Sequence, residues 1–180
     1  MRARSVKGIR PEGSLRENAV RIVATRLDEA LAFDRAIRDP ANVAELHDLR
    51  IAAKRLRYVL EVVGPVLGGD LRRLERTARE VQDLLGDIHD CDVLVPLVDA
   101  HVHELRESDR AWLREAAKTD ADLRERLARV PNRTTYRGLE TLAGYLEARR
   151  GLLYGTFLER WDRFLAEEWP RRVREAAQPL

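Results

Sequence analysis

Apolar residues recur at intervals of three and four along most of the chain, the spacing that places them on one face of an α-helix. No run of four or more residues alternates in the manner of a strand, so we predict no strands. Breaks at Asp39-Pro40, Gly64-Pro65 and Gly86 divide the pattern into successive helices. The pattern therefore predicts an all-α fold: an antiparallel four-helix bundle with an additional helical hairpin arm and a long C-terminal helix.

The first two predicted helices each open on a capping box, in which a polar side chain and a glutamate three residues later satisfy the first backbone N–H groups. Ser14 with Glu17 forms the first box, and Asn42 with Glu45 forms the second. We expect these helices to end at the first two breaks.

A turn at Gly68-Gly69-Asp70 predicts the start of a third helix, which we expect to end near Gly86. Asp90 or Asp92 is then expected to cap a fourth helix, in whose first turns Pro96 is tolerable.

The segment 110–130 is helical by propensity but strongly charged, so we place it as a peripheral hairpin arm. Residues 131–135, which read PNRTT, form the clearest loop in the chain. After this loop an apolar stripe extends from Leu139 to Phe164, before Pro170, and predicts one long helix.

The chain of 180 residues is long enough to bury a core without a disulfide or a structural metal. We expect one helical domain over 14–170, a flexible N-terminus over 1–13 and a C-terminal tail over 171–180. The basic start lacks the apolar core of a signal peptide, and no stretch approaches about 18 apolar residues. With Cys91 as its one thiol, the protein is expected to be cytoplasmic and to have no contact with membranes.

The net charge of +2, from 33 basic and 31 acidic residues, conceals an uneven distribution. Residues 1–38 carry nine cations and five anions, residues 45–79 carry eight and five, and residues 80–130 carry seven and thirteen. The chain is basic in front and acidic in the middle. A near-neutral average therefore does not exclude a polyanionic partner.

The second predicted helix carries a row of basic side chains beside its apolar stripe. On a helical wheel, the row comprises His47, Arg50, Lys54 and Arg57. It is about 15 Å long, which suits several successive phosphates better than one carboxylate. Only Glu61, at the far end, is an intrahelical acidic partner on this ridge. Because the cations repel one another, we expect a neighbouring acidic helix or an anionic ligand to neutralise them.

The third predicted helix carries a similar row of Arg72, Arg76 and Arg79. Antiparallel packing of the two helices would bring both rows to one groove. A structural alternative stays open, in which the rows are solvated faces held by ion pairs and Asp83 simply pairs with Arg79.

Arg150 lies inside the apolar stripe of the last predicted helix, between Leu146 and Leu153. A charge at such a position needs a partner, because an unpaired charge among apolar atoms is costly. A buried acid and an anionic ligand are both open alternatives.

Signals for enzymatic activity are weak. Asp87, His89, Asp90 and Asp92 resemble metal ligands, but a helix junction also attracts aspartate for capping. The chain contains none of the glycine-rich phosphate-binding motifs and no nucleophile elbow. We therefore expect no catalytic residue, no metal site and no cofactor.

Three segments together resemble the CHAD domain, a histidine-containing α-helical domain. Residues 47–58 read HDLRIAAKRLRY and resemble the His-x-x-Arg-x-x-x-basic-Arg-x-Arg helix of that family. Residues 83–94 resemble its second signature, and residues 144–150 resemble its closing helix. The resemblance covers about residues 40–98 and 138–165.

The resemblance implies a helical domain that binds inorganic polyphosphate in a basic central groove and associates with polyphosphate granules. CHAD domains usually contain two four-helix halves in tandem, whereas this chain has a single His-x-x-Arg helix and looks like one half. We therefore expect a homodimer in which the second copy replaces the missing half.

The leading hypothesis is a non-enzymatic polyphosphate-binding module. Its expected contacts are His47, Arg50, Lys54, Arg57, Arg72, Arg76, Arg79 and, as a lesser candidate, Arg150. The low aromatic content makes nucleic acid an unlikely partner, since binders of single strands stack bases on exposed rings.

Two other hypotheses stay open. In the first, the chain is a structural adaptor whose basic rows pair with an acidic partner protein. In the second, it is a metal-dependent phosphohydrolase that uses Asp87, Asp90 and Asp92.

Overall fold

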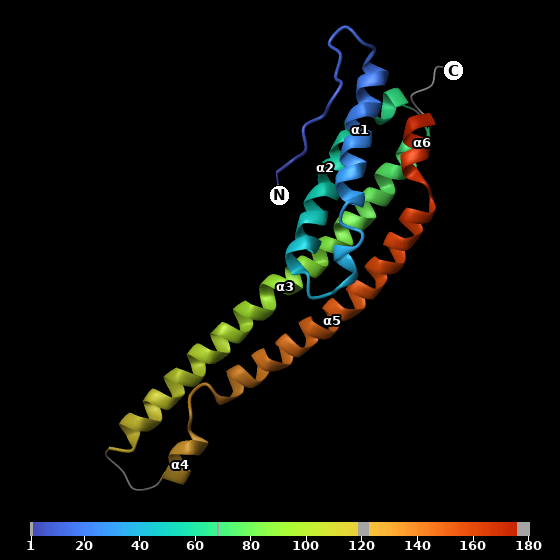
Figure 1. Ribbon diagram of the computed structural model, residues 1–180. Coiled ribbons are helices and arrows are strands. Elements are labelled where there is room, and N and C mark those ends of the chain that lie inside the picture. Colours follow the sequence, from blue (N-terminus) through green and yellow to red (C-terminus); the bar gives the residue numbers. More distant parts are fainter. Residues whose placement is uncertain (1, 68, 119–122, 176–180) are drawn as a thin grey trace. The chain divides into compact units, whose positions relative to one another are not determined.

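The computed structural model describes residues 2–67, 69–118 and 123–175. Within these ranges the chain forms six α-helices and one short 3₁₀ helix and contains no strand, so the predicted all-α class is confirmed (Figure 1). The elements are α1 (Leu15–Leu31), η1 (Ala36–Arg38), α2 (Val43–Leu67), α3 (Gly69–Ala116), α4 (Leu123–Ala128), α5 (Arg133–Ala166) and α6 (Trp169–Glu175).

The chain divides into two compact units, which we call the first unit (residues 1–89 and 152–180) and the second unit (residues 90–151). Both boundaries fall inside long helices, α3 and α5, so each of these helices contributes to both units. The sequence suggested a single domain with an arm limited to 110–130. Helical periodicity continues through α3 and α5, and it therefore gives no signal of a division.

The start of α1 follows the predicted cap, because the Ser14 hydroxyl accepts the backbone N–H of Glu17 at 3.2 Å. The segment before it, expected to be a flexible N-terminus, is held at Arg10 and at Arg4. The backbone N–H of Arg10 donates to the Asn18 side-chain oxygen at 3.0 Å, and the Asn18 amide donates to the Arg10 carbonyl oxygen at 2.7 Å. The backbone N–H of Arg4 donates to the buried carboxylate of Glu29, and Arg26 contacts both Glu29, at 2.6 Å, and the carbonyl oxygen of Arg4, at 2.9 Å.

The first helix ends at Leu31, so its predicted extension to Asp39-Pro40 is wrong. The chain turns and continues as η1, in which Ile37 is fully buried. The turn places the Asp34 carboxylate 2.8 Å from the indole N–H of Trp161, on α5. Local propensity would allow the helix to continue beyond Leu31. The burial of Ile37 and the hydrogen bond between Asp34 and Trp161 favour the turn instead.

The predicted breaks at Gly64-Pro65 and Gly86 are also wrong, since α2 continues to Leu67 and α3 continues through Gly86 and Pro96. Leu85, Ile88 and Cys91 keep helical spacing across Gly86, and all three are buried. Continued burial of one helix face outweighs the cost of about 1 kcal/mol for a glycine inside a helix. Asp90 and Asp92 consequently lie within the helix and not at a cap.

The predicted long helix is confirmed as α5, which begins at Arg133, so the last three residues of the expected 131–135 loop are helical. Glu168, with a φ of 51°, lies in the short connection to α6. Trp169 and Val173 of α6 are buried, and α6 packs against α1. Part of the segment that the sequence assigned to a tail is therefore helical.

The first unit is built around the aromatic side chains of α5. Phe157, Trp161 and Phe164 are almost fully buried, and the rings of Trp161 and Phe164 stack at a centroid distance of 5.1 Å. Figure 1 shows α1 beside α2 in this unit. Burial of Asp34 raises the pKa of its carboxyl, but the hydrogen bonds from Arg38 and Trp161 and the Arg38 charge together lower it, so the buried indole faces an ionised partner.

No helix in the described part of the chain combines the length and apolar character that crossing a membrane requires.

Candidate functional site

Helices α2 and α3 pack antiparallel, and three contacts join the side chains that the sequence placed in basic rows. Arg57 donates to the side-chain oxygen of Gln82 at 2.9 Å, and Arg79 pairs with Glu61 at 3.0 Å. Nearer the start of α2, the rings of His47 and His89 lie 4.6 Å apart between centroids. We name the combined surface the α2–α3 cationic face; it comprises His47, Arg50, Lys54, Arg57, Arg72, Arg76 and Arg79.

One end of the cationic face is half-buried and contains polar atoms without partners. The nitrogens His47 Nδ1 and Arg50 Nε are buried, and neither has a hydrogen-bond partner within the described ranges. A Cβ built on Gly86 would lie 3.6 Å from Arg50 Nε, so the arginine rests against the backbone of α3 at its glycine. Because buried polar groups are normally satisfied, these atoms are suited to a ligand or to water.

Two cations of the face are already paired inside the first unit. Arg57 pairs with Glu61 at 2.8 Å, while Arg79 pairs with Glu75 at 2.8 Å and shares Glu61 with Arg57. The hydrogen bond to Glu75 is the main cause that raises the pKa of the exposed Arg79. The sequence considered Asp83 as the partner of Arg79, but the ion pairs are with Glu75 and Glu61.

Four cations of the face, Arg50, Lys54, Arg72 and Arg76, form no ion pair with any residue that the structure describes. Lys54, Arg72 and Arg76 are exposed. The Lys54 ammonium lies 5.7 Å from the centroid of the Tyr58 ring, which also carries the Arg57 guanidinium at 4.4 Å. The face therefore presents uncompensated positive charge to solvent.

Arg150 has a different environment. It lies in the second unit, where its guanidinium pairs with the carboxylate of Asp92, and both side chains are largely buried. Of the two alternatives that the sequence left open, a buried acid is the partner that the structure provides.

The acidic cluster considered as a metal site does not assemble into one. Within the described ranges, no group of three or more histidine, cysteine, aspartate or glutamate side chains is placed to hold a metal ion. Asp92 is engaged by Arg150, and His89 faces His47.

The sequence missed His89, Gln82 and Gly86 as neighbours of the basic rows. Gly86 follows Arg72 and Arg79 at intervals of seven residues, and His89 lies three residues further, so all lie close to one face of a continuous helix. Because a helix break was expected at Gly86, His89 was not placed on the helix that carries Arg72 and Arg79. It was grouped with the aspartates instead.

Comparison with curated proteins and with solved structures finds no match. The family model of the CHAD domain matches residues 3–99, which include the whole cationic face but not Arg150. Because the match covers more than half of the 180 residues, this chain belongs to the CHAD domain family.

Proposed function

We propose that the chain is a non-enzymatic module that binds inorganic polyphosphate on the α2–α3 cationic face. The observation that carries the proposal is the set of four cations that have no ion pair among the described residues, Arg50, Lys54, Arg72 and Arg76. Membership of the CHAD family, in which polyphosphate binding is known, supports the same ligand. The proposal locates the protein in the cytoplasm, at polyphosphate granules.

The chemistry of the face suits this polymer. Polyphosphate is a flexible, repeating polyanion without bases, so its binding needs spaced cations and no stacking platform. Arginine donates two parallel hydrogen bonds to phosphate oxygens.

A titration with long-chain polyphosphate at two salt concentrations tests the proposal. We expect the affinity to fall by an order of magnitude or more between about 50 and 200 mM salt, because several cations would release counterions together. Isothermal titration calorimetry measures both affinities, with orthophosphate as the control ligand that engages few cations. An absence of binding, or an affinity that salt does not change, would contradict the proposal.

Glu61 is expected to compete with the ligand, because its carboxylate pairs with both Arg57 and Arg79. The substitution Glu61→Gln keeps the shape of the side chain and removes one charged partner from each guanidinium group, although Arg79 keeps its ion pair with Glu75. Affinity for polyphosphate should rise severalfold, measured by the same titration. The control Glu159→Gln removes one carboxylate that makes a single long contact of 3.9 Å with Arg163, and it should leave the affinity nearly unchanged. Equal affinities of the Glu61 and Glu159 variants would argue against a role for Arg57 and Arg79.

The proposal includes a homodimer, in which a second copy supplies the half that this chain lacks. Both long helices of the second unit expose large apolar side chains that an interface would cover. They are Val93, Leu94 and Leu97 on α3 and Leu142 and Tyr145 on α5.

Sedimentation equilibrium with and without polyphosphate should report twice the mass of the 20.7 kDa chain. The variant Leu97→Glu, at an exposed position, should reduce the mass to that of one chain. A single-chain mass for the unchanged protein in both conditions would contradict the dimer.

The adaptor hypothesis keeps one supporting observation, namely that Arg57 and Arg79 already pair with glutamates of the chain itself. An acidic partner protein would extend such pairing to Lys54, Arg72 and Arg76. This hypothesis expects no affinity for polyphosphate, so the salt titration distinguishes it from the leading proposal.

A further inference from the structure

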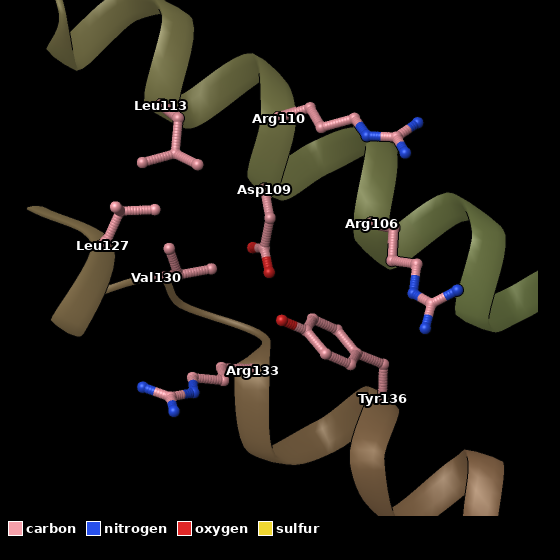
Figure 2. Close-up of a pocket in the computed structure, with 8 residues that line it drawn as sticks. All are labelled: Arg106, Asp109, Arg110, Leu113, Leu127, Val130, Arg133 and Tyr136. Atoms are coloured by element: carbon pink, nitrogen blue, oxygen red, sulfur yellow. The ribbon is translucent and has the colours of Figure 1, made fainter. Parts of the chain in front are cut away.

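The second unit contains a pocket of about 450 Å³ that lies apart in sequence from the cationic face. Its size is within the range of about 300 to 1,000 Å³ that small-molecule sites occupy. Figure 2 shows that α3, the segment from α4 to α5 and the first turn of α5 surround it. The lining residues are Arg106, Asp109, Arg110, Leu113, Leu127, Val130, Arg133 and Tyr136.

Asp109 supplies the pocket with a buried and incompletely satisfied carboxylate. The residue is 5% exposed, and its Oδ1 accepts the backbone N–H and the side-chain amide of Asn132 at 3.2 and 2.9 Å. Its Oδ2 is buried and has no hydrogen-bond partner among the described residues. Leaving a buried acceptor unsatisfied is costly, and for a charged group more so. The free oxygen is therefore suited to an N–H donor from a ligand.

The remaining inner wall is apolar, with one further polar group. Figure 2 shows the hydroxyl of Tyr136 directed toward the Asp109 carboxylate, with the side chains of Leu113, Leu127 and Val130 on the other side. A ligand that donates to Asp109 would therefore rest its body on aliphatic side chains. This combination favours an apolar molecule with one cationic or N–H group.

The arginines around the pocket differ in how they are neutralised. Arg106 pairs with Glu140, and Arg110 pairs with Glu107. Arg133 forms no ion pair with any residue in the described part of the chain. One cation at the pocket is thus available to an anion, in addition to the carboxylate inside.

We propose that this pocket binds a small zwitterion with an apolar body, of the class of apolar dipeptides. Its ammonium donates to Asp109 Oδ2, its aliphatic side chains contact Leu113, Leu127 and Val130, and its carboxylate pairs with Arg133. The site shares no residue with the cationic face, so its occupation is independent of polyphosphate binding.

The test uses the full chain labelled with ¹⁵N and three matched probes. Leucyl-leucine carries both charges, leucyl-leucinamide lacks the carboxylate, and 4-methylpentanoyl-leucine lacks the amine. Amide chemical shifts measure where each probe binds and how tightly. We expect leucyl-leucine to shift the amides of Asp109, Asn132 and Tyr136, and the other two probes to bind at least about tenfold more weakly. Equal affinity of all three probes, or shifts confined to other residues, would overturn the proposal.

Two variants test whether leucyl-leucine binds in the pocket. Asp109→Asn keeps an acceptor for Asn132 but loses the negative charge, and we expect at least about tenfold weaker binding of leucyl-leucine. Val130→Phe fills the pocket and leaves the hydrogen bonds of Asp109 in place. It therefore tests the site even if Asp109→Asn destabilises the fold. It should abolish the shifts.

Arg133→Ala should weaken the binding of leucyl-leucine but not that of leucyl-leucinamide. Arg137 is an exposed arginine of the same helix that does not line the pocket, so Arg137→Ala should change the affinity for neither probe. Unchanged binding to both Asp109→Asn and Val130→Phe would overturn the proposal. Polyphosphate affinity of these variants should equal that of the unchanged protein, so failure here is distinguishable from failure of the proposed function.

Discussion

The double substitution Arg50→Ala with Lys54→Ala is expected to weaken polyphosphate binding about a hundredfold, at salt concentrations where the unchanged protein binds measurably. Neither side chain has an ion pair among the described residues, so both charges are available to phosphate. Arg50 also holds a buried Nε that lacks a hydrogen-bond partner. Calorimetric titration measures the loss, and the dependence of the affinity on salt should become shallower by about one unit of log–log slope per cation removed.

A matched control removes the same two residue types elsewhere. Arg163→Ala with Lys118→Ala deletes one arginine and one lysine whose ion pairs among the described residues are exposed, with Glu159 and Glu115. This variant has the same net charge as the double variant of the face, and it should retain most of the affinity. If both double variants bind equally well, the position of the charge does not matter and the assignment of the site is wrong.

The substitution Trp161→Ala is expected to destabilise the first unit by about 3 to 5 kcal/mol. Trp161 is 1% exposed and packs beside the helices α1, α2 and α3. Its indole N–H also donates to Asp34 at 2.8 Å, so truncation leaves a cavity and removes a partner of a carboxylate. The loss is a large part of the roughly 5 to 15 kcal/mol that stabilises a typical domain. Urea denaturation followed by far-ultraviolet circular dichroism measures it.

Trp161→Phe separates the effect of the cavity from the effect of the lost hydrogen bond to Asp34. This variant keeps most of the aromatic volume and loses only the N–H, so we expect less than half of the destabilisation of the alanine variant. Leu152→Ala, at an exposed position of the same helix, should cost almost nothing. A loss below about 1 kcal/mol for Trp161→Ala would contradict the packing of α5 in the first unit.

Helix identity and the start of α1 at Ser14 could be read from the sequence, whereas the positions where helices end could not. The stripe that contains Phe157, Trp161 and Phe164 predicts α5, because a period of 3.6 residues needs no knowledge of the neighbours. Gly86 and Asp39-Pro40 are local signals for a helix end, and both were misleading. At Gly86 the buried residues on either side extend the helix, and before Asp39 the bond between Asp34 and Trp161 ends it early. The contact of Asp34 joins residues 127 positions apart, so no local signal could reveal it.

The candidate site shows the same difference between what residue spacing predicts and what tertiary contacts decide. Spacing alone placed the basic rows of α2 and α3, and it also flagged Arg150 as a charge in need of a partner. Spacing identified Glu61 as the intrahelical partner in the α2 row, but it did not identify the partners that lie on another helix. Glu61 neutralises Arg57 within its helix and reaches Arg79 on the next one, and Asp92 neutralises Arg150 across 58 residues of sequence.

The sequence by itself determined the helical class, the apolar faces and the residues that bear positive charge, because these depend on residue type and on the geometry of a single helix. Only the tertiary structure decided the continuity of α3, the division into two units and the pairing of cations with acids on other helices. Ion pairs act over a few ångströms, so the partner of a charge depends on which helices pack together. The same holds for Asp109, whose free oxygen becomes visible only once α3 and the start of α5 enclose it.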